Sequence, residues 1–277
     1  MSKRITHIAT QPPLGALRPR SVLDLADLRD RLPEAIEIAA RAAEDPAALA
    51  GSLAARRIGC LADRPVPALL AAVDAVGARL EAIAAEPSSP GADLLEEEAR
   101  DLAGRSDLVA LALGDHGHVA EAACAAAALV PTLGLSSDRH APGTALSVLG
   151  VLAARLGTLA ARKLVLVGPC SGLTHDLMLG GARSGLHVVL SCPYGHWPSP
   201  AIERRATELA ADHGGAVDVA PGGSRALIGA DAIVVEDDPR GLADAAPAAL
   251  RLGRGGEDAS ARHRGVGEQA LLRLLLA

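Results

Sequence analysis

The sequence predicts an α/β protein built from parallel β-sheets with helices on their faces. Short apolar runs alternate with amphipathic stretches along the whole chain, which is the pattern of βα units. Gly- and Pro-containing turns separate these runs. The 277 residues suffice for one large domain or two smaller ones. A polar turn precedes a long apolar helix near the middle, so we place a domain boundary within residues 134–150.

The first half of the chain gives the less regular pattern. Helices are predicted where apolar residues recur at helical spacing, and strands where a short apolar run is followed by a turn. The expected helices are an amphipathic one within 21–43, one near 67–85, an acidic one at 94–104 and an alanine-rich one at 118–128. The expected strands are 56–62, the apolar run within 106–117, and 129–135, with a loop at 86–93.

The second half repeats the alternation more clearly. A long helix at 144–160 leads into the strand KLVLVG, a glycine turn and another helix. The remaining strands are expected at 163–168, 187–193, 216–220 and 231–237, and the remaining helices at 174–185, 199–215, 224–230 and 265–276. Strands alternating with helices in this way form parallel sheets with covered faces.

Composition excludes several classes of function. The net charge is −6 and aromatic residues make up 1% of the chain, so nucleic-acid binding is not expected. No apolar run is long enough for a membrane span, and the N-terminus lacks a signal-peptide pattern. The four cysteines are dispersed, which indicates neither a disulfide framework nor a metal site. We therefore expect a cytoplasmic protein without membrane contact.

The stretch KLVLVGPCSGLTHD carries the sharpest local motif. Gly168, Cys170 and Gly172 have the spacing of a nucleophile elbow with cysteine in place of serine. Asp231 or Glu236, followed by His263, would complete the chain order of a hydrolase triad. The alternative is a tight strand-to-helix turn that needs small residues, and we favour it because short motifs match by chance.

Two further clusters have simpler explanations. His116 and His118 have no third ligand nearby, so a solvated turn is favoured over a metal site. Tyr194 and Trp197 lie in a Pro-rich loop that either covers a ligand or forms a local surface cluster.

Several longer stretches resemble the aspartate and ornithine transcarbamoylase family, especially its ornithine type. LVPTLGLSSDRHAPGTALSVLGVLAARLG is similar to the family's valine-proline strand, its serine-aspartate turn, its His-Pro-x-Gln motif and the following helix. GADAIVVEDD matches an Ala-Asp strand that ends in an acid, and GEQALLRLLLA matches the last helix. The resemblance implies two doubly wound parallel-sheet domains, 1–140 and 141–277, with helix 265–276 packing back on the N-terminal domain.

The resemblance also implies roles for individual residues. His140 falls on the histidine that contacts the carbamoyl group, and a donor at a helix start can polarise a carbonyl oxygen. Glu236 falls where ornithine enzymes keep an aspartate that grips the α-amino group, and Ser171 and Asp176 lie at or beside amino-acid contacts. Arg64 is the nearest cation to the phosphate loop, and Gly143 or Thr144 replaces the motif glutamine.

The departures from the family concern the site that binds carbamoyl phosphate, the donor of the carbamoyl group. The family holds carbamoyl phosphate with a Ser-Thr-Arg-Thr-Arg loop, whereas this chain has Val66-Pro67-Ala68-Leu69-Leu70. The family's later arginine falls near Ala112. A small dianion depends on charge-assisted hydrogen bonds worth about 1.5–3 kcal/mol each, so losing several removes most of the affinity. Ordinary transcarbamoylation is therefore expected to be impaired or absent.

Three functional hypotheses follow. The first is a transcarbamoylase-fold protein that binds an amino acid or carbamoyl-type ligand, or acts as a structural or regulatory partner of an active relative. The second is a divergent carbamoyltransferase with a phosphate site rebuilt from Arg64, His140 and a neighbouring subunit. The third is the Cys170 hydrolase. The resemblance implies a homotrimer, and we expect neither a cofactor nor a metal.

Overall fold

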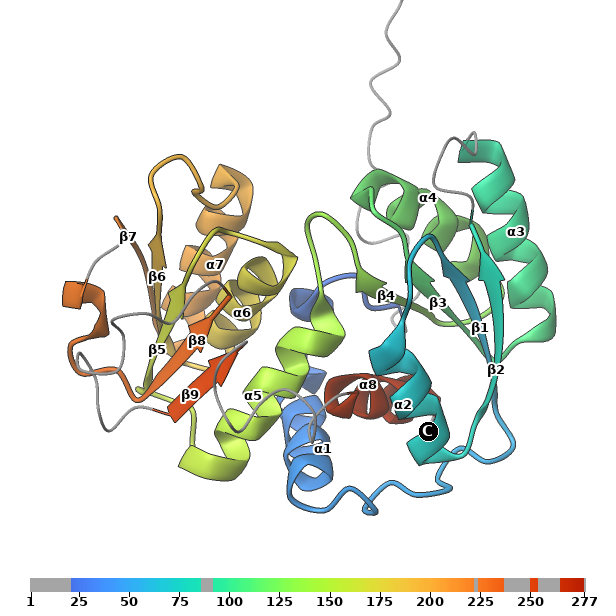
Figure 1. Cartoon of the computed structure of the whole chain (residues 1–277), viewed down its shortest axis with the longest axis horizontal. Coiled ribbons are helices and arrows are strands. Elements are labelled where there is room, and N and C mark those ends of the chain that lie inside the picture. The colour runs from blue at the N-terminus through green and yellow to red at the C-terminus, as the bar shows by residue number, and fades with distance from the viewer. Residues whose placement is uncertain (1–20, 86–91, 222–223, 237–249, 254–264, 277) are drawn as a thin grey trace, which may run out of the picture.

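A computed structural model describes residues 21–85, 92–221, 224–236, 250–253 and 265–276. Within these ranges the chain forms two parallel β-sheets joined by helices (Figure 1). The predicted α/β class with two doubly wound sheets is confirmed. The predicted division at residues 140 and 141 falls between the last strand of the first sheet and the helix that leads to the second.

The first sheet has the strand order β2-β1-β3-β4. Its strands are β1 (Arg57–Ala62), β2 (Arg79–Ala84), β3 (Leu108–Ala112) and β4 (Thr132–Ser136). The helices that connect them are α2 (Pro67–Val76), α3 (Ala92–Arg105) and α4 (His116–Ala127). Leu108 to Ala112 are buried along all of β3, as expected of a central parallel strand with both faces covered.

The second sheet has the order β7-β6-β5-β8-β9. Its strands are β5 (Lys163–Val167), β6 (His187–Cys192), β7 (Ala216–Pro221), β8 (Ala232–Val235) and β9 (Leu250–Gly253). The helices α6 (Gly172–Arg183) and α7 (Pro200–His213) and the short η2 (Ser224–Leu227) follow β5, β6 and β7.

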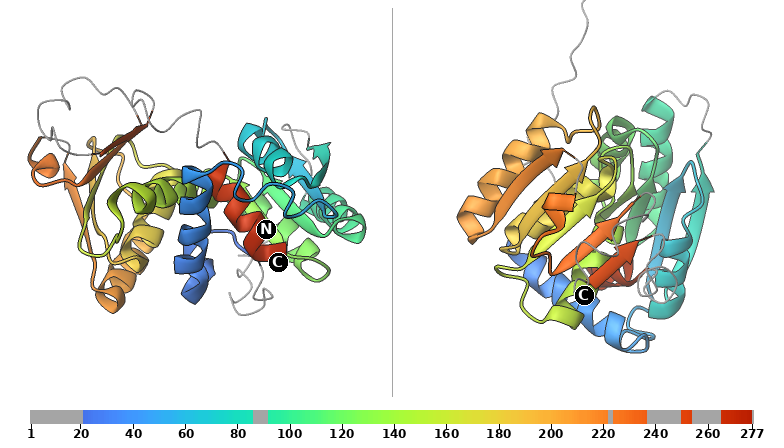
Figure 2. Two further views of the ribbon diagram at one scale, coloured as in Figure 1. Left: turned by 90° about the horizontal axis from the view of Figure 1, so that it is seen from below. Right: turned by 60° about the vertical axis from the view of Figure 1, so that its left-hand side comes forward.

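Three helices join the sheets: α1 (Leu32–Glu44), α5 (Pro142–Leu156) and α8 (Val266–Leu276). They pack on one another, α8 also packs on α2, and α5 also packs on α6 (Figures 1 and 2). A continuous aliphatic core runs from β1 and β3 through these helices to β5 and β6. The predicted last helix thus contacts helices on both sides of the proposed boundary.

Residues 21–24, the N-terminal segment, lie along the edge of the first sheet. Val22 donates its N–H to the Thr132 carbonyl and accepts from the Gly134 N–H, beside β4. The short helix η1 (Leu25–Arg31) follows, and Asp24 and Asp27 cap its start reciprocally. This capping places both carboxylates at the junction of the two halves of the molecule.

The predicted helix near 67–85 is wrong in its second half. Helix α2 ends at Val76, with Gly77 in the left-handed conformation at φ 72°. Residues 79–84 then form the edge strand β2, most of whose residues are exposed to solvent. Glycine adopts a positive φ more readily than residues with a Cβ, so Gly77 suits the left-handed conformation that ends the helix.

Candidate functional site

His140 lies in a tight turn between β4 and α5. Ser137 closes the turn: its N–H donates to the His140 carbonyl at 2.8 Å, and its Oγ accepts the His140 N–H at 3.1 Å. Gly172, at the start of α6, packs on the His140 backbone so closely that a Cβ would collide with it. Residue His140 is therefore 6% exposed and held between the two sheets.

Asp176 on α6 fixes the orientation of His140. The Asp176 carboxylate is fully buried and accepts three N–H groups: Leu25 N at 2.9 Å, Ala141 N at 2.6 Å and His140 Nδ1 at 3.3 Å. Burial disfavours the charged imidazolium of His140, but the hydrogen bond to Asp176 and its charge outweigh burial and raise the pKa of His140. Asp176 thereby joins three segments that are far apart in sequence.

Two further histidines flank His140. The His116 ring centroid lies 4.8 Å from that of His140, and the His175 centroid lies 6.2 Å from it. Burial and the neighbouring charge of His140 lower the pKa of His116 to about 4. The pKa of His175 is lowered for the same reasons, with burial the larger cause. His116 and His175 are thus neutral near pH 7.

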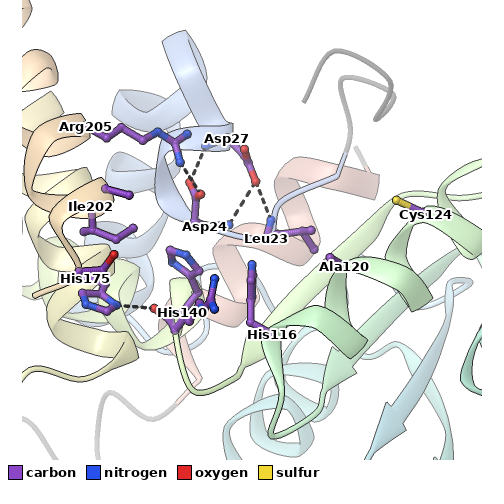
Figure 3. A pocket seen from close by; sticks show the side chains of 13 residues that line it. Leu23, Asp24, Asp27, His116, Ala120, Cys124, His140, His175, Ile202 and Arg205 are labelled. Atoms are coloured by element: carbon purple, nitrogen blue, oxygen red, sulfur yellow. Dashed lines mark hydrogen bonds and ion pairs between the residues drawn. The ribbon is translucent and has the colours of Figure 1, made fainter. Parts of the chain in front are cut away.

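These histidines open onto a cavity of about 440 Å³ between α4 and α7 (Figure 3). The cavity is lined by residues of the N-terminal segment, α4, the β4–α5 turn, α6 and α7. They are Leu23, Asp24, Asp27, His116, Ala120, Cys124, Arg139, His140, His175, Ser199, Ala201, Ile202 and Arg205. Tyr194 and Trp197, which the sequence suggested as a cover, are not among them and are 92% and 42% exposed.

Asp24 and Asp27 supply the carboxylates of this cavity. Asp24 Oδ1 caps η1 through the N–H groups of Ala26 and Asp27, while Oδ2 accepts from Arg205 of α7 at 2.7 Å. Burial, followed by the charge of Asp24, raises the pKa of Asp27 to about 6. The ion pair between Asp24 and Arg205 could not be expected from the sequence, because its partners are 181 positions apart.

The start of α2, where the resemblance places the phosphate loop, is apolar. Pro67 occupies its first turn, Val66 makes no side-chain cap, and the first turn carries no acidic residue. Arg64 is half-exposed and is paired with Asp63, the Nε–Oδ1 distance being 2.7 Å. Asp63 Oδ2 also accepts the Gly114 N–H at 2.6 Å.

Asp63 is therefore a fixed negative charge beside α2. Burial acts to raise the pKa of Asp63, but the hydrogen bonds from Arg64 and Gly114 outweigh it and lower the pKa. An anion arriving here would have to compete with this carboxylate for the Arg64 guanidinium and the Gly114 N–H. The geometry does not favour a dianion at this place.

Gly143 stands in the first turn of α5, where the family motif has glutamine. The buried Glu268 of α8 lies against Gly143 and leaves no room for a Cβ there. The adjacent Thr144 is exposed and is not part of the cavity lining. A role for Thr144 in ligand binding stays a prediction.

Ser171 and Glu236 come together at the carboxyl ends of β5 and β8. Glu236 Oε1 accepts from the Thr174 hydroxyl at 3.0 Å and from the Ser171 hydroxyl at 2.5 Å. Ser171 also caps α6 through the Thr174 N–H. Both hydroxyls thus hold the carboxylate in place. Their predicted role toward an amino acid stays open.

Cys170 does not have the surroundings of a nucleophile. Burial, with smaller effects of Cys192 and Glu236, raises the pKa of the Cys170 thiol to about 12. Asp231 lies at the amino end of β8, away from Cys170, where its carboxylate accepts from Arg162 and from the Lys163 N–H. His263 lies outside the described residues. This geometry does not favour the hydrolase hypothesis.

Within the described ranges, no group of three His, Cys, Asp or Glu side chains is placed to hold a metal ion. Nor is any helix in those ranges long and apolar enough to cross a membrane.

Comparison with known proteins gives partial matches in sequence and nearly complete matches in structure. No family model matches the chain. The ornithine carbamoyltransferase of Acidothermus cellulolyticus is 32% identical over 164 residues, which are 59% of this chain and 49% of the relative. That of Symbiobacterium thermophilum is 36% identical over 109 residues, 39% of this chain and 35% of the relative. The matches thus span half or less of the length of these curated relatives.

Solved structures show the fold. Ornithine carbamoyltransferase from Gloeobacter violaceus superimposes with a TM-score of 0.80 at 21% identity, over 94% of this chain and 99% of that one. The enzyme from Pyrococcus furiosus gives a TM-score of 0.76 at 19% identity, over 94% and 97%.

Proposed function

We infer that this chain, whose sequence and fold resemble those of ornithine carbamoyltransferases, does not carry out ordinary transcarbamoylation. It would act instead as an amino-acid-binding protein or as a structural or regulatory partner of an active relative. A shared fold leaves function open, so the proposal depends on the site.

The observation that supports the inference is the chemistry at the start of α2. Carbamoyl phosphate needs several charge-assisted hydrogen bonds, each worth about 1.5–3 kcal/mol. Here the first turn is apolar, and the Asp63 carboxylate already takes the Arg64 guanidinium and the Gly114 N–H. The site therefore offers a small dianion few free donors and a repelling charge.

The direct test is citrulline formation from ornithine and carbamoyl phosphate. We expect no product above the rate without protein, because the donor is not bound. An active ornithine carbamoyltransferase assayed in parallel serves as the positive control. Citrulline formation at an enzyme-like rate would refute the proposal.

One observation favours a divergent enzyme as a second candidate. His140 keeps its place between the sheets, and its hydrogen bond to Asp176 raises its pKa, so a titratable ring remains at the wall of a cavity. Such an enzyme would use a changed donor or a phosphate site completed by a neighbouring subunit. Product formation with a different carbamoyl donor would support it.

The proposed assembly is a homotrimer in the cytoplasm, as the family resemblance implies. Light scattering is expected to give a mass of three times the 28.0 kDa chain. A mass of one chain at micromolar concentration would contradict the trimer. A stable complex of different stoichiometry with an active relative would instead support the role of a partner.

A further inference from the structure

Three histidines from three elements meet at the junction of the two halves (Figure 3). His116 begins α4, His140 lies in the turn before α5, and His175 lies on α6. We propose that they form an acid-sensitive switch, in which a proton taken up by His116, in addition to the one on His140, loosens the packing of α4 against this turn. The inference goes beyond the proposed function, which depends on the start of α2.

Of the three rings, His140 is the one with an ion-pair partner in the described part of the chain. The fully buried Asp176 accepts from His140 Nδ1 at 3.3 Å. The carboxylates that line the cavity are engaged elsewhere: Asp24 pairs with Arg205 at 2.7 Å, and Asp27 accepts two backbone N–H groups. A positive charge on His140 is therefore stabilised by Asp176, whereas a second charge on a neighbouring ring has no such partner.

The hydrogen bonds around Ser137 leave no place for a proton on His116 Nδ1. Ser137 Oγ lies 3.3 Å from that nitrogen and accepts the backbone N–H groups of Arg139 at 3.2 Å and His140 at 3.1 Å. A hydroxyl oxygen accepts two hydrogen bonds and donates one, so both of its acceptor positions are filled. Its hydrogen can then point to Nδ1, which is nearer than the His140 carbonyl oxygen at 3.5 Å. A protonated His116 would bring a second hydrogen into this contact, and the turn would have to move.

The wider surroundings of His116 act in the same direction. Burial, followed by the positive charges of His140 and Arg139, lowers the pKa of His116 from 6.5 to about 4. Burial, and to a lesser extent the charge of His140, also lowers the pKa of His175. An imidazole that is more basic when exposed than when packed stabilises the packed state fully above pH 6.5. This contribution is lost as the pH falls toward 4.

Other groups that face the cluster also respond to pH. The charged or titratable side chains around His116 and His175 are Asp24, Asp27, Asp138, Arg139, His140, Asp176 and Arg205. Burial raises the pKa of Asp27 to about 6 and also raises that of Asp176. Against the effect of burial, the hydrogen bond to Asp176 raises the pKa of His140. These groups bind a proton more readily in the packed state, so their effect opposes that of His116. They are present in every variant of His116, and a comparison of variants therefore isolates the switch.

Hydrogen exchange of the full chain at pH 7 and pH 5, followed by mass spectrometry, tests the switch. After correction for intrinsic rates, the protection of the α4 amides is compared in the wild type and in His116→Asn, whose side chain can accept from Ser137 but does not titrate. A group whose pKa changes from about 4 when packed to 6.5 when exposed weakens the packing about 20-fold between these two pH values. The loss of protection in α4 is therefore expected to be about 20-fold larger in the wild type than in the variant.

His118→Asn is the matched control, because His118 lies on the same helix but does not line the cavity. It is expected to follow the wild type, and the central strand β5 is expected to keep its protection in every protein. His175→Asn, whose amide can still donate to the Arg139 carbonyl, is the second variant in case His116→Asn does not fold, and it is expected to lose less protection in acid than the wild type. Equal losses in the wild type and the folded variants overturn the proposal. So does a loss in β5 as large as that in α4, or a control that behaves like His116→Asn.

Discussion

Asp176→Ala is expected to lower the free energy of unfolding by about 3–5 kcal/mol, the usual cost of removing one partner of a buried charged pair. The carboxylate is completely buried and accepts from Leu25 N, Ala141 N and His140 Nδ1. Its removal leaves these donors without an acceptor in the interior. Leu25 belongs to η1, and Ala141 and His140 belong to the turn before α5. Loss of the carboxylate therefore weakens the contacts of both segments with α6 at the same time.

Urea denaturation at pH 7, followed by circular dichroism, measures this loss. Asp176→Asn is the matched variant, since the amide oxygen still accepts while the charge and one acceptor are lost. It is expected to be destabilised less than the alanine variant. A change of less than about 0.5 kcal/mol in Asp176→Ala, the range of ordinary surface substitutions, would show that the carboxylate does not hold the halves together.

Glu268 is expected to make the protein less stable as the pH rises. Residue Glu268 is 3% exposed, none of the described groups donates a hydrogen bond to its Oε2, and burial raises its pKa from 4.5 to about 7. Between these two pH values the folded protein keeps a proton that the unfolded chain has released. The contribution of Glu268 to stability is therefore fully present below pH 4.5, and about 3 kcal/mol of it is lost as the pH rises from 4.5 through 7.

Glu268→Gln removes this contribution while keeping the shape of the side chain. Urea denaturation at pH 5 and pH 8 is expected to show the variant equal to the wild type or slightly above it at pH 5 and clearly more stable at pH 8. Asp27, whose raised pKa acts in the same direction, is common to both proteins and cancels in the comparison. Glu97→Gln, which leaves Glu268 in place, should follow the wild type. Equal pH dependence in wild type and Glu268→Gln would contradict the account of Glu268.

The strands could be predicted where apolar residues run continuously. Leu108–Ala112 and Lys163–Val167 are central strands of parallel sheets, and their sequences show it because both faces are covered. The edge strand Arg79–Ala84 was missed because it is mostly open to solvent and its residues continue the amphipathic pattern of α2. Gly77 was the available signal for the end of that helix.

Some residues of the candidate site could be predicted from the strand topology, whereas the positions of others depend on how the helices pack. Ser171 and Glu236 follow neighbouring parallel strands, so their meeting at one sheet edge could be expected. His140 was identified through the family resemblance. The pairing of Asp24 with Arg205, and the place of His175, depend on how α7 and α6 pack on the N-terminal segment, which no local pattern encodes.

Isothermal titration of carbamoyl phosphate into the purified chain tests the loss of the donor site most directly. With an apolar first turn in α2 and Asp63 holding both Arg64 and the Gly114 N–H, we predict a dissociation constant weaker than about 1 mM. A dissociation constant in the micromolar range would mean that the site still binds its dianion, and the inferred loss of transcarbamoylation would no longer stand.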